Sequence, residues 1–393
     1  MGTTPHAKGN AARSVVRLVF ASGLVQGTVM VAFAASSAVL RARHGFTDAQ
    51  YGSLFVPQMT LAALGAIGSS ALARVLSLPR MLELSFLLMA LSQAALFGSH
   101  FLSPGLAFAV VLGGTSLVGL GSGLSAAPLN TYPQTLFPGR RDTAVVAMHT
   151  AMGIGLTAGP LLVSATVALG VWLCFPACLL AICLGLLVVT GRVGLPAAPV
   201  PATPGAGPVT SPAFWLFAAI TFLYAIAEST YSNWAVIYLS EEKGLSVATA
   251  SLGLAAFWAA LCAGRIVVGA LVIRLPAEHF IVVLPLLMAG ASLLLPGANT
   301  AGRGLALFGL AGLGCSAFYP LTIGLASRRF PDHVAWVTAM TFAALVAGIG
   351  VGSFLVGVLR AQMDLAHLYS WSAACPLLAL CLTRWAKRPA PQG

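Results

Sequence analysis

The chain has 393 residues, of which 59% are hydrophobic and only 7% are charged. A soluble protein of this length cannot cover its surface with so few charges, so the composition predicts a membrane protein with many spans. The net charge is +11, and the charged residues recur in short loops between apolar runs. That pattern is typical of cytoplasmic loops beside anionic lipid and argues against a nucleic-acid-binding protein.

Apolar runs of about 18–28 residues, each long enough to cross a bilayer, recur along the chain. We count twelve, near residues 14–40, 51–73, 81–100, 104–136, 143–168, 170–190, 212–239, 248–273, 277–296, 302–327, 333–359 and 366–386. The sequence therefore predicts an all-α membrane protein of twelve transmembrane helices in two six-helix bundles.

The expected bundles occupy residues 14–190 and 212–386. Between them, the Pro- and Gly-rich stretch 191–211 cannot form a regular helix and is predicted to be a linker. Residues 1–13 and 387–393 are expected to be short tails. The N-terminal tail leads into a long span with no short apolar region and cleavage site, so no removable signal peptide is expected.

Lys and Arg residues predict the orientation. An even number of spans places both termini on one side. With the N-terminus in the cytoplasm, the inner segments hold 14 of the 20 Lys and Arg residues and the outer loops hold 5, while Arg265 lies within a span. The positive-inside rule therefore predicts cytoplasmic termini and a cytoplasmic linker. Arg41 and Arg43 are the main exceptions on the outer side.

The two halves of the sequence repeat each other. HGFTDAQYGSLF (44–55) parallels KGLSVATASLGL (243–254), and Thr47 and Ser246 are the predicted N-caps of the helices that follow. The repeat extends to two pairs of glycines, Gly155 with Gly348 and Gly159 with Gly352. A parallel repeat of six spans is typical of transporters built from two rocking bundles.

Twelve spans in two halves with a central linker resemble the major facilitator superfamily. GLGSGLSAAPLN (119–130) followed by MHTAMGIGLTAGP (148–160) is similar to the fourth and fifth helices of its fucose-permease-like branch. AESTYSNWAVIYL (227–239) resembles the seventh helix of that branch, and FWAALCAGRIVVG (257–269) resembles the eighth. The resemblance implies a major facilitator fold and solute transport by alternating access, with the solute near the midplane between the bundles.

The sequence departs from the family pattern in two places. GAIGSSALARVLSLPR (65–80) keeps Arg74 and Arg80 but lacks the Asp of the family's usual loop. Sugar-transporting members of the branch rely on carboxylates in the first and fourth spans. Here Gln26 is the polar group of the first span and Asn130 that of the fourth.

Glu228 is the one acid, of nine in the chain, that the span pattern places within the bilayer core. A carboxylate at that depth is costly and is a functional-site hypothesis by default. Helical spacing puts Tyr224 and Tyr231 on the same face, where their hydroxyls can bond the carboxyl group. Burial favours the protonated form, so we expect Glu228 to be the proton-coupling group. The alternative is a structural contact with a neighbouring helix.

Further polar residues are expected to contact the solute together with Gln26, Tyr224 and Tyr231. Asn130 and His149 lie at similar depths in the fourth and fifth spans, where a hydrogen bond between them can serve either the solute or helix packing. Asn233 and Trp234 do not share the face of Glu228 on a regular helix. They join the site only if the seventh helix is broken near Ser232.

Other residues are candidates for the gates. Arg265 needs an anion, helix carbonyls or water, and we expect it at the inner gate; binding an anionic group of the solute is the alternative. Arg74 is expected at the inner gate as well. The stretch containing Gly155, Gly159 and Pro160 is similar to a motif of superfamily antiporters, and it permits a close helix approach and a bend.

The expected function is secondary transport of a small organic solute, coupled to protons, by a monomer in the cytoplasmic (inner) membrane. No P-loop, H-E-x-x-H or G-x-S-x-G motif is present, so we expect neither an ATP-driven pump nor an enzyme. All seven cysteines fall inside apolar runs, without metal-ligand spacing, and no cofactor is expected. The alternatives are a proton-driven efflux antiporter for drug-like or metabolite solutes, and a non-transporting receptor or assembly protein on the same fold.

The orientation is tested by reporter fusions after Gly393. We expect a reporter that is active only in the cytoplasm to be active there, and one that is active only outside to be silent, because the expected inner segments carry most of the positive charge. The reverse pattern would show that the charge count assigns the wrong side.

Overall fold

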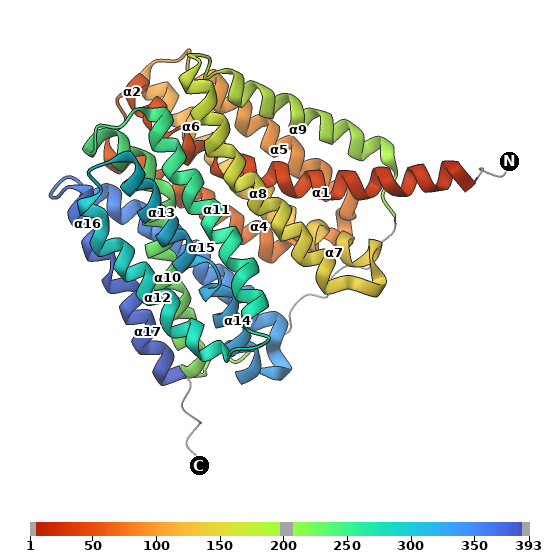
Figure 1. Cartoon of the computed structure of the whole chain (residues 1–393). Helices are drawn as coiled ribbons and strands as arrows, with labels where there is room; N and C mark the ends of the chain where they lie inside the picture. The colour runs from red at the N-terminus through yellow and green to blue at the C-terminus, as the bar shows by residue number, and fades with distance from the viewer. Residues whose placement is uncertain (1–4, 197–206, 387–393) are drawn as a thin grey trace. The chain divides into compact units, whose positions relative to one another are not determined.

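The computed structural model describes residues 5–196 and 207–386, and all regular elements in these ranges are helical (Figure 1). Twelve helical stretches within them are long and apolar enough to cross a membrane. This confirms the predicted all-α fold with twelve spans, in which each helix satisfies its own backbone hydrogen bonds. The seven cysteines are free thiols. Parts of the predicted tails and linker (1–4, 197–206 and 387–393) lie outside the described residues.

The chain forms two compact units. Unit 1 contains Met1–Phe33 and Leu61–Thr203, and unit 2 contains Ala34–Thr60 and Pro204–Gly393. This division differs from the one expected at the linker in a single segment. Ala34–Thr60, which ends the first span and begins the second, groups with the second half of the chain.

Unit 1 takes most of α1 (Pro5–Ala35) and of α4 (Phe55–Leu76). Its other helices are α5 (Leu78–Ser99), α6 (Pro104–Leu124), α7 (Ala126–Leu136), η1 (Pro138–Arg140), α8 (Arg141–Ala168) and α9 (Cys174–Val193). Helix α5 packs against α6 and α9, and α7 packs against α8. The fourth span consists of α6 and α7 and is interrupted at Ser125.

Unit 2 contains the second half of the spans together with two short helices from the first half. Its helices are α2 (Ser37–His44), α3 (Asp48–Ser53), α10 (Pro212–Ile237), η2 (Tyr238–Glu242), α11 (Val247–Leu271), α12 (Ala277–Leu294), η3 (Leu295–Gly297), α13 (Ala301–Cys315), α14 (Phe318–Arg329), η4 (Pro331–His333), α15 (Val334–Leu359), α16 (Leu365–Ser372) and α17 (Ala374–Ala386). Helix α10 packs against α11, α15 and α17, and α3 packs against α15. The tenth span is interrupted between α13 and α14.

The repeated turns have the same local structure in both halves. Gly45 and Gly244 both have φ of +66°, the left-handed region that favours glycine. Two residues later, the Thr47 hydroxyl accepts a hydrogen bond from the amide of Gln50, and the Ser246 hydroxyl accepts one from Thr249, each at 3.2 Å. The predicted N-caps of α3 and α11 are therefore confirmed.

Glycines also allow two equivalent close helix contacts. A Cβ atom added at Gly155 in α8 would overlap the carbonyl group of Leu24 in α1. In the second half, a Cβ atom at Gly348 in α15 would lie 2.6 Å from the Cβ atom of Ala225 in α10. Gly159 and Gly352, one turn further along, face the same partner helices. These glycines bring helix backbones together, as small residues do in membrane bundles.

We expect Gly155→Val to destabilise the protein, because α1 leaves no room for a side chain at this position. Overpacking of this kind costs about 1–3 kcal/mol. Gly185→Val in α9 is the matched control, since no atom lies within 4 Å of a Cβ atom there. Thermal unfolding of the purified variants measures the difference. Equal melting temperatures for the two variants would contradict the close contact.

A candidate proton and solute site

Glu228 lies in the middle of α10 and is only 8% exposed. It is the only buried acid among the described side chains. Helix α10 contacts α11, α14, α15 and α17, so its sides are covered by other helices of unit 2. The carboxyl group is therefore held inside the unit and not at its rim.

Tyr224, one turn before Glu228, interacts with the Glu228 carboxyl group. It is 1% exposed, and its hydroxyl donates a hydrogen bond to the Cys315 carbonyl at 2.9 Å. A tyrosine hydroxyl has a single proton to donate. While Tyr224 donates this proton to the hydrogen bond with the Cys315 carbonyl, the hydroxyl oxygen of Tyr224 can accept a hydrogen bond from a protonated Glu228.

Tyr231, one turn after Glu228, has a different role from the one expected. Its hydroxyl donates to the Met288 carbonyl of α12 at 2.8 Å and contacts the Ser292 hydroxyl. The side chain is fully buried, and its ring stacks on Tyr369. The expected hydrogen bond to Glu228 is not made, because α12 takes the only proton that Tyr231 can donate.

The break in the tenth span lies beside Glu228. Helix α13 ends at Cys315 and α14 begins at Phe318, so carbonyl groups at the end of α13 lack helical partners. The Cys315 carbonyl accepts from Tyr224, and the Ser316 carbonyl accepts from Nε of Arg265 at 2.8 Å. These two carbonyl groups at the break therefore receive hydrogen bonds from one side chain of α10 and one of α11.

Gly264 allows Arg265 to reach this break. A Cβ atom on Gly264 would lie 2.6 Å from the Cβ atom of Ser316, so α11 and the end of α13 approach closely here. The expected role of Arg265 at the inner gate stays a prediction, and so does its alternative, the binding of an anionic group of the solute. The expected role of Arg74, which is exposed in the last turn of α4, also stays a prediction.

Unit 1 has an equivalent break without a charge. The fourth span is interrupted at Ser125, whose hydroxyl donates to Oε1 of Gln26 at 2.6 Å. Both side chains are buried. Each unit thus places a polar contact at the break of its corresponding span, and only the break in unit 2 has an ionisable side chain, Arg265, bonded to its backbone.

Asn130 and His149 pair as the sequence predicts. Oδ1 of Asn130 lies 3.3 Å from Nε2 of His149, and the Asn130 amide nitrogen also donates to the Ala126 carbonyl. Both residues are exposed on α7 and α8. A polar pair facing lipid within the span would be costly, so this face is expected to meet water or solute.

Asn233 and Trp234 do not join the Glu228 site. Helix α10 is regular through Ile237, and its irregular turn, the π-helical η2, comes only at Tyr238–Glu242. The Asn233 amide nitrogen donates to the Ser353 hydroxyl at 2.7 Å, and the ring of Trp234 packs edge-on against Tyr51. The break near Ser232 on which their inclusion depended is not formed, so we reassign both to packing of α10 against α3 and α15.

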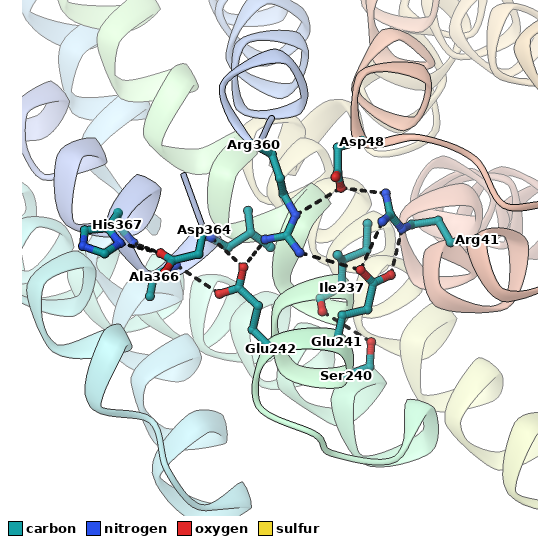
Figure 2. A network of polar contacts seen from close by, with 11 residues as sticks. Arg41, Asp48, Ile237, Ser240, Glu241, Glu242, Arg360, Asp364, Ala366 and His367 are labelled. Carbon is teal, nitrogen blue, oxygen red and sulfur yellow. Dashed lines mark hydrogen bonds and ion pairs between the residues drawn. The ribbon is translucent and has the colours of Figure 1, made fainter. Parts of the chain in front are cut away.

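A second polar site in unit 2 was not anticipated from the sequence. We call it the ion cluster; it consists of Arg41, Asp48, Glu241, Glu242 and Arg360 (Figure 2). Arg41 binds both carboxylate oxygens of Glu241, at 2.7 and 3.1 Å. Asp48 bridges the two arginines, at 2.7 Å from Arg41 and 3.1 Å from Arg360.

Glu242 ties the ion cluster to the start of α16. It pairs with Arg360, and its carboxylate also accepts hydrogen bonds from the amides of Leu365 at 2.6 Å and Ala366 at 3.2 Å. A carboxylate is stabilised at a helix N-terminus in this way. Burial alone would lower the pKa of Arg360, but Glu242, followed by Asp48 and Glu241, raises it above its usual value. Arg360 is therefore charged throughout the physiological pH range.

One signal in the sequence indicated such a cluster. The two arginines, Arg41 and Arg360, lie on the predicted outer side, against the charge bias. The acidic pair Glu241–Glu242 and Asp48 lie at span ends that the same topology places on that side. Matching opposite charges on one predicted side would have suggested these partners.

A double-mutant cycle with Arg41→Gln and Glu241→Gln tests the ion cluster. We expect a coupling free energy of about 1–2 kcal/mol in thermal unfolding, because the pair is bidentate and half-buried. The control is the exposed pair Asp364–His367, for which about 0.2–0.5 kcal/mol is expected. Equal coupling in the two pairs would show that the ion cluster adds no more than a surface contact.

Comparisons with known proteins identify the family. Residues 18–302 match the Major Facilitator Superfamily. The fold is similar to a bacterial homologue of the human lysosomal transporter Spinster in an inward-facing and occupied conformation, with a TM-score of 0.74, 13% identity and coverage of 99% of this chain and 100% of that chain.

The same homologue in an inward-facing and unoccupied conformation gives a TM-score of 0.69 at 13% identity, with coverage of 98% of this chain and 96% of that chain. No curated protein sequence matches significantly. At this level of identity the solved structures establish the fold alone, and the resemblance to the fucose-permease-like branch stays a prediction. The family match covers most of the sequence, and the chain belongs to the Major Facilitator Superfamily.

Proposed function

We propose that this membrane transporter moves a small organic solute across the cytoplasmic membrane by alternating access, coupled to protons through Glu228. The observation that carries the proposal is a carboxyl group buried in the middle of a span, one helical turn from Tyr224, whose hydroxyl bonds the break of another span. Ionisable groups inside membrane spans commonly form proton relays. Membership of a family of transporters supports the same function.

Tyr224 provides a physical link between the proton and the helix break. When Glu228 is protonated, it can donate to the Tyr224 oxygen while Tyr224 donates to Cys315. When the proton leaves, the carboxylate needs a donor, and the Tyr224 proton must turn away from Cys315 to supply one. Loss of the proton therefore frees a carbonyl group at the end of α13 and weakens the contact between α10 and the tenth span.

The ion cluster fits the role of an outer gate. The predicted topology places its five residues on the outer side. Arg41 and Asp48 come from the first half of the chain, and the three other members come from the second half. We infer that the ion cluster holds these segments together while the outer side is closed and separates when that side opens. This role also gives a reason for the position of Arg41 on the predicted outer side, against the positive-inside rule.

The transport function can be tested once a solute is found. A thermal-shift screen of the purified protein against sugars, nucleosides, carboxylates and cationic drugs identifies one, since a ligand of the native state stabilises it. Saturable, gradient-dependent uptake into proteoliposomes then supports coupled transport. Proton-driven loss of preloaded solute would indicate an efflux antiporter, and binding without either flux would indicate a receptor.

We expect Glu228→Gln to bind solute and exchange it across the membrane, but not to accumulate it against a gradient. Glutamine has the shape of the protonated acid but cannot release a proton. Glu278→Gln, in the first turn of α12, is the matched control and should accumulate solute like the parent protein. If Glu228→Gln concentrates solute with the parent's pH dependence, Glu228 is structural, and His149 becomes the next candidate for the coupling group.

A further inference from the structure

Arg265 carries a positive charge inside a membrane span, and no described carboxylate is in direct contact with it. It lies in α11, six residues before the end of the helix, and its side chain is exposed. Nε donates to the Ser316 carbonyl. In the described ranges, no carboxylate oxygen lies within 4.0 Å of the guanidinium nitrogens, and no hydrogen bond holds Nη1 or Nη2.

The arginines of the ion cluster show the contrast. Arg41 contacts two carboxylates and Arg360 contacts three, although both lie at the ends of spans. A charge deeper in the bilayer has the greater need of a partner or of water. One carbonyl group at the end of α13 compensates a guanidinium only in part. The arrangement therefore leaves a planar pair of donors open to an incoming group.

Aromatic and acidic groups lie near the fork of Arg265, by which we mean its Nη1 and Nη2 atoms. Arg265 interacts electrostatically with Tyr224, Glu228 and Tyr319. The rings of Tyr224 and Tyr319 are nearly parallel, at 13°, with centroids 6.4 Å apart. Tyr319 is half-buried and so offers part of its surface beside Arg265. The same part of unit 2 thus presents a cation, an aromatic surface and a carboxyl group.

We propose that the transported solute is an organic carboxylate whose two oxygens bind Nη1 and Nη2 of Arg265, with its apolar part against Tyr319. The proposal rests on the transport function proposed above and names the class of solute. Guanidinium groups bind carboxylates through two parallel hydrogen bonds, which gives both affinity and orientation. Nε is anchored on a backbone carbonyl, so the fork is held in place before the solute arrives.

The neighbouring Glu228 then explains why proton and solute travel together. Two negative charges close to one another inside a membrane repel strongly. A solute carboxylate on Arg265 therefore binds better when Glu228 carries a proton. One carboxylate and one proton together add no net charge to the span, which lowers the electrostatic cost of moving them through the membrane.

Equilibrium binding tests this assignment without requiring transport. The probes are acetate, butyrate and benzoate, each paired with its neutral amide, together with inorganic phosphate as a second anion. Thermal shifts of the purified full-length protein report their binding. We expect benzoate to stabilise the parent protein and benzamide not to, and butyrate to bind more tightly than acetate because it covers more apolar surface.

Variants then assign the anion to Arg265. We expect Arg265→Gln to weaken benzoate binding at least about 30-fold, because it removes the positive charge and the paired charge-assisted hydrogen bonds to the carboxylate. Arg265→Lys keeps the charge but loses the fork, and we expect intermediate binding. Arg274→Gln, in the exposed segment after α11, is the matched control and should bind like the parent protein.

The outcomes separate this proposal from the role of Glu228. Glu228→Gln should still bind benzoate, so a loss restricted to Arg265→Gln supports the carboxylate site whether or not Glu228 couples protons. Equal shifts with benzoate and benzamide, or no shift with any carboxylate, would overturn it. Stabilisation by phosphate alone would overturn the choice of a carboxylate. A lower melting temperature of Arg265→Gln with unchanged benzoate binding would show that Arg265 only caps α13.

Discussion

The cost of an unsatisfied polar group inside a bilayer is the constraint from which the rest of this structure follows. An unbroken helix satisfies its own backbone, but the tenth span is interrupted between α13 and α14, where carbonyl groups of Cys315 and Ser316 take side chains as partners. The structure places side chains at this break and at the one in the fourth span. Gln26 meets Ser125 in unit 1, and Tyr224 and Arg265 meet the end of α13 in unit 2. In unit 2, the candidate site lies where the backbone carbonyls at the end of α13 take side-chain partners.

The two halves share this plan but differ in charge. Equivalent turns, glycine contacts and span breaks recur in both halves. At the breaks, the first half uses a neutral amide and a hydroxyl, and the second uses a guanidinium next to a buried carboxyl group. The repeat therefore supplies the framework, and Glu228 and Arg265 place a charged pair of residues near the break in unit 2 only.

Local pattern was enough to predict some of this site. Hydrophobic run length gave the twelve spans, and helical spacing placed Tyr224 beside Glu228. The same spacing wrongly suggested that Tyr231 bonds Glu228, because the sequence does not show which neighbouring helix supplies an acceptor. The ion cluster could not be predicted from local pattern. Asp48 and Arg360 are separated by 312 positions, and no periodicity connects residues that far apart.

Infrared difference spectroscopy of the protein in lipid bilayers, recorded between acidic and alkaline pH, shows whether Glu228 exchanges a proton and is hydrogen-bonded to Tyr224 when protonated. We expect a band from a protonated carboxyl group that disappears in Glu228→Gln and shifts in Tyr224→Phe, where the phenol oxygen is missing. A carboxyl band that is unchanged in Glu228→Gln would contradict the assignment of the coupled proton to this residue.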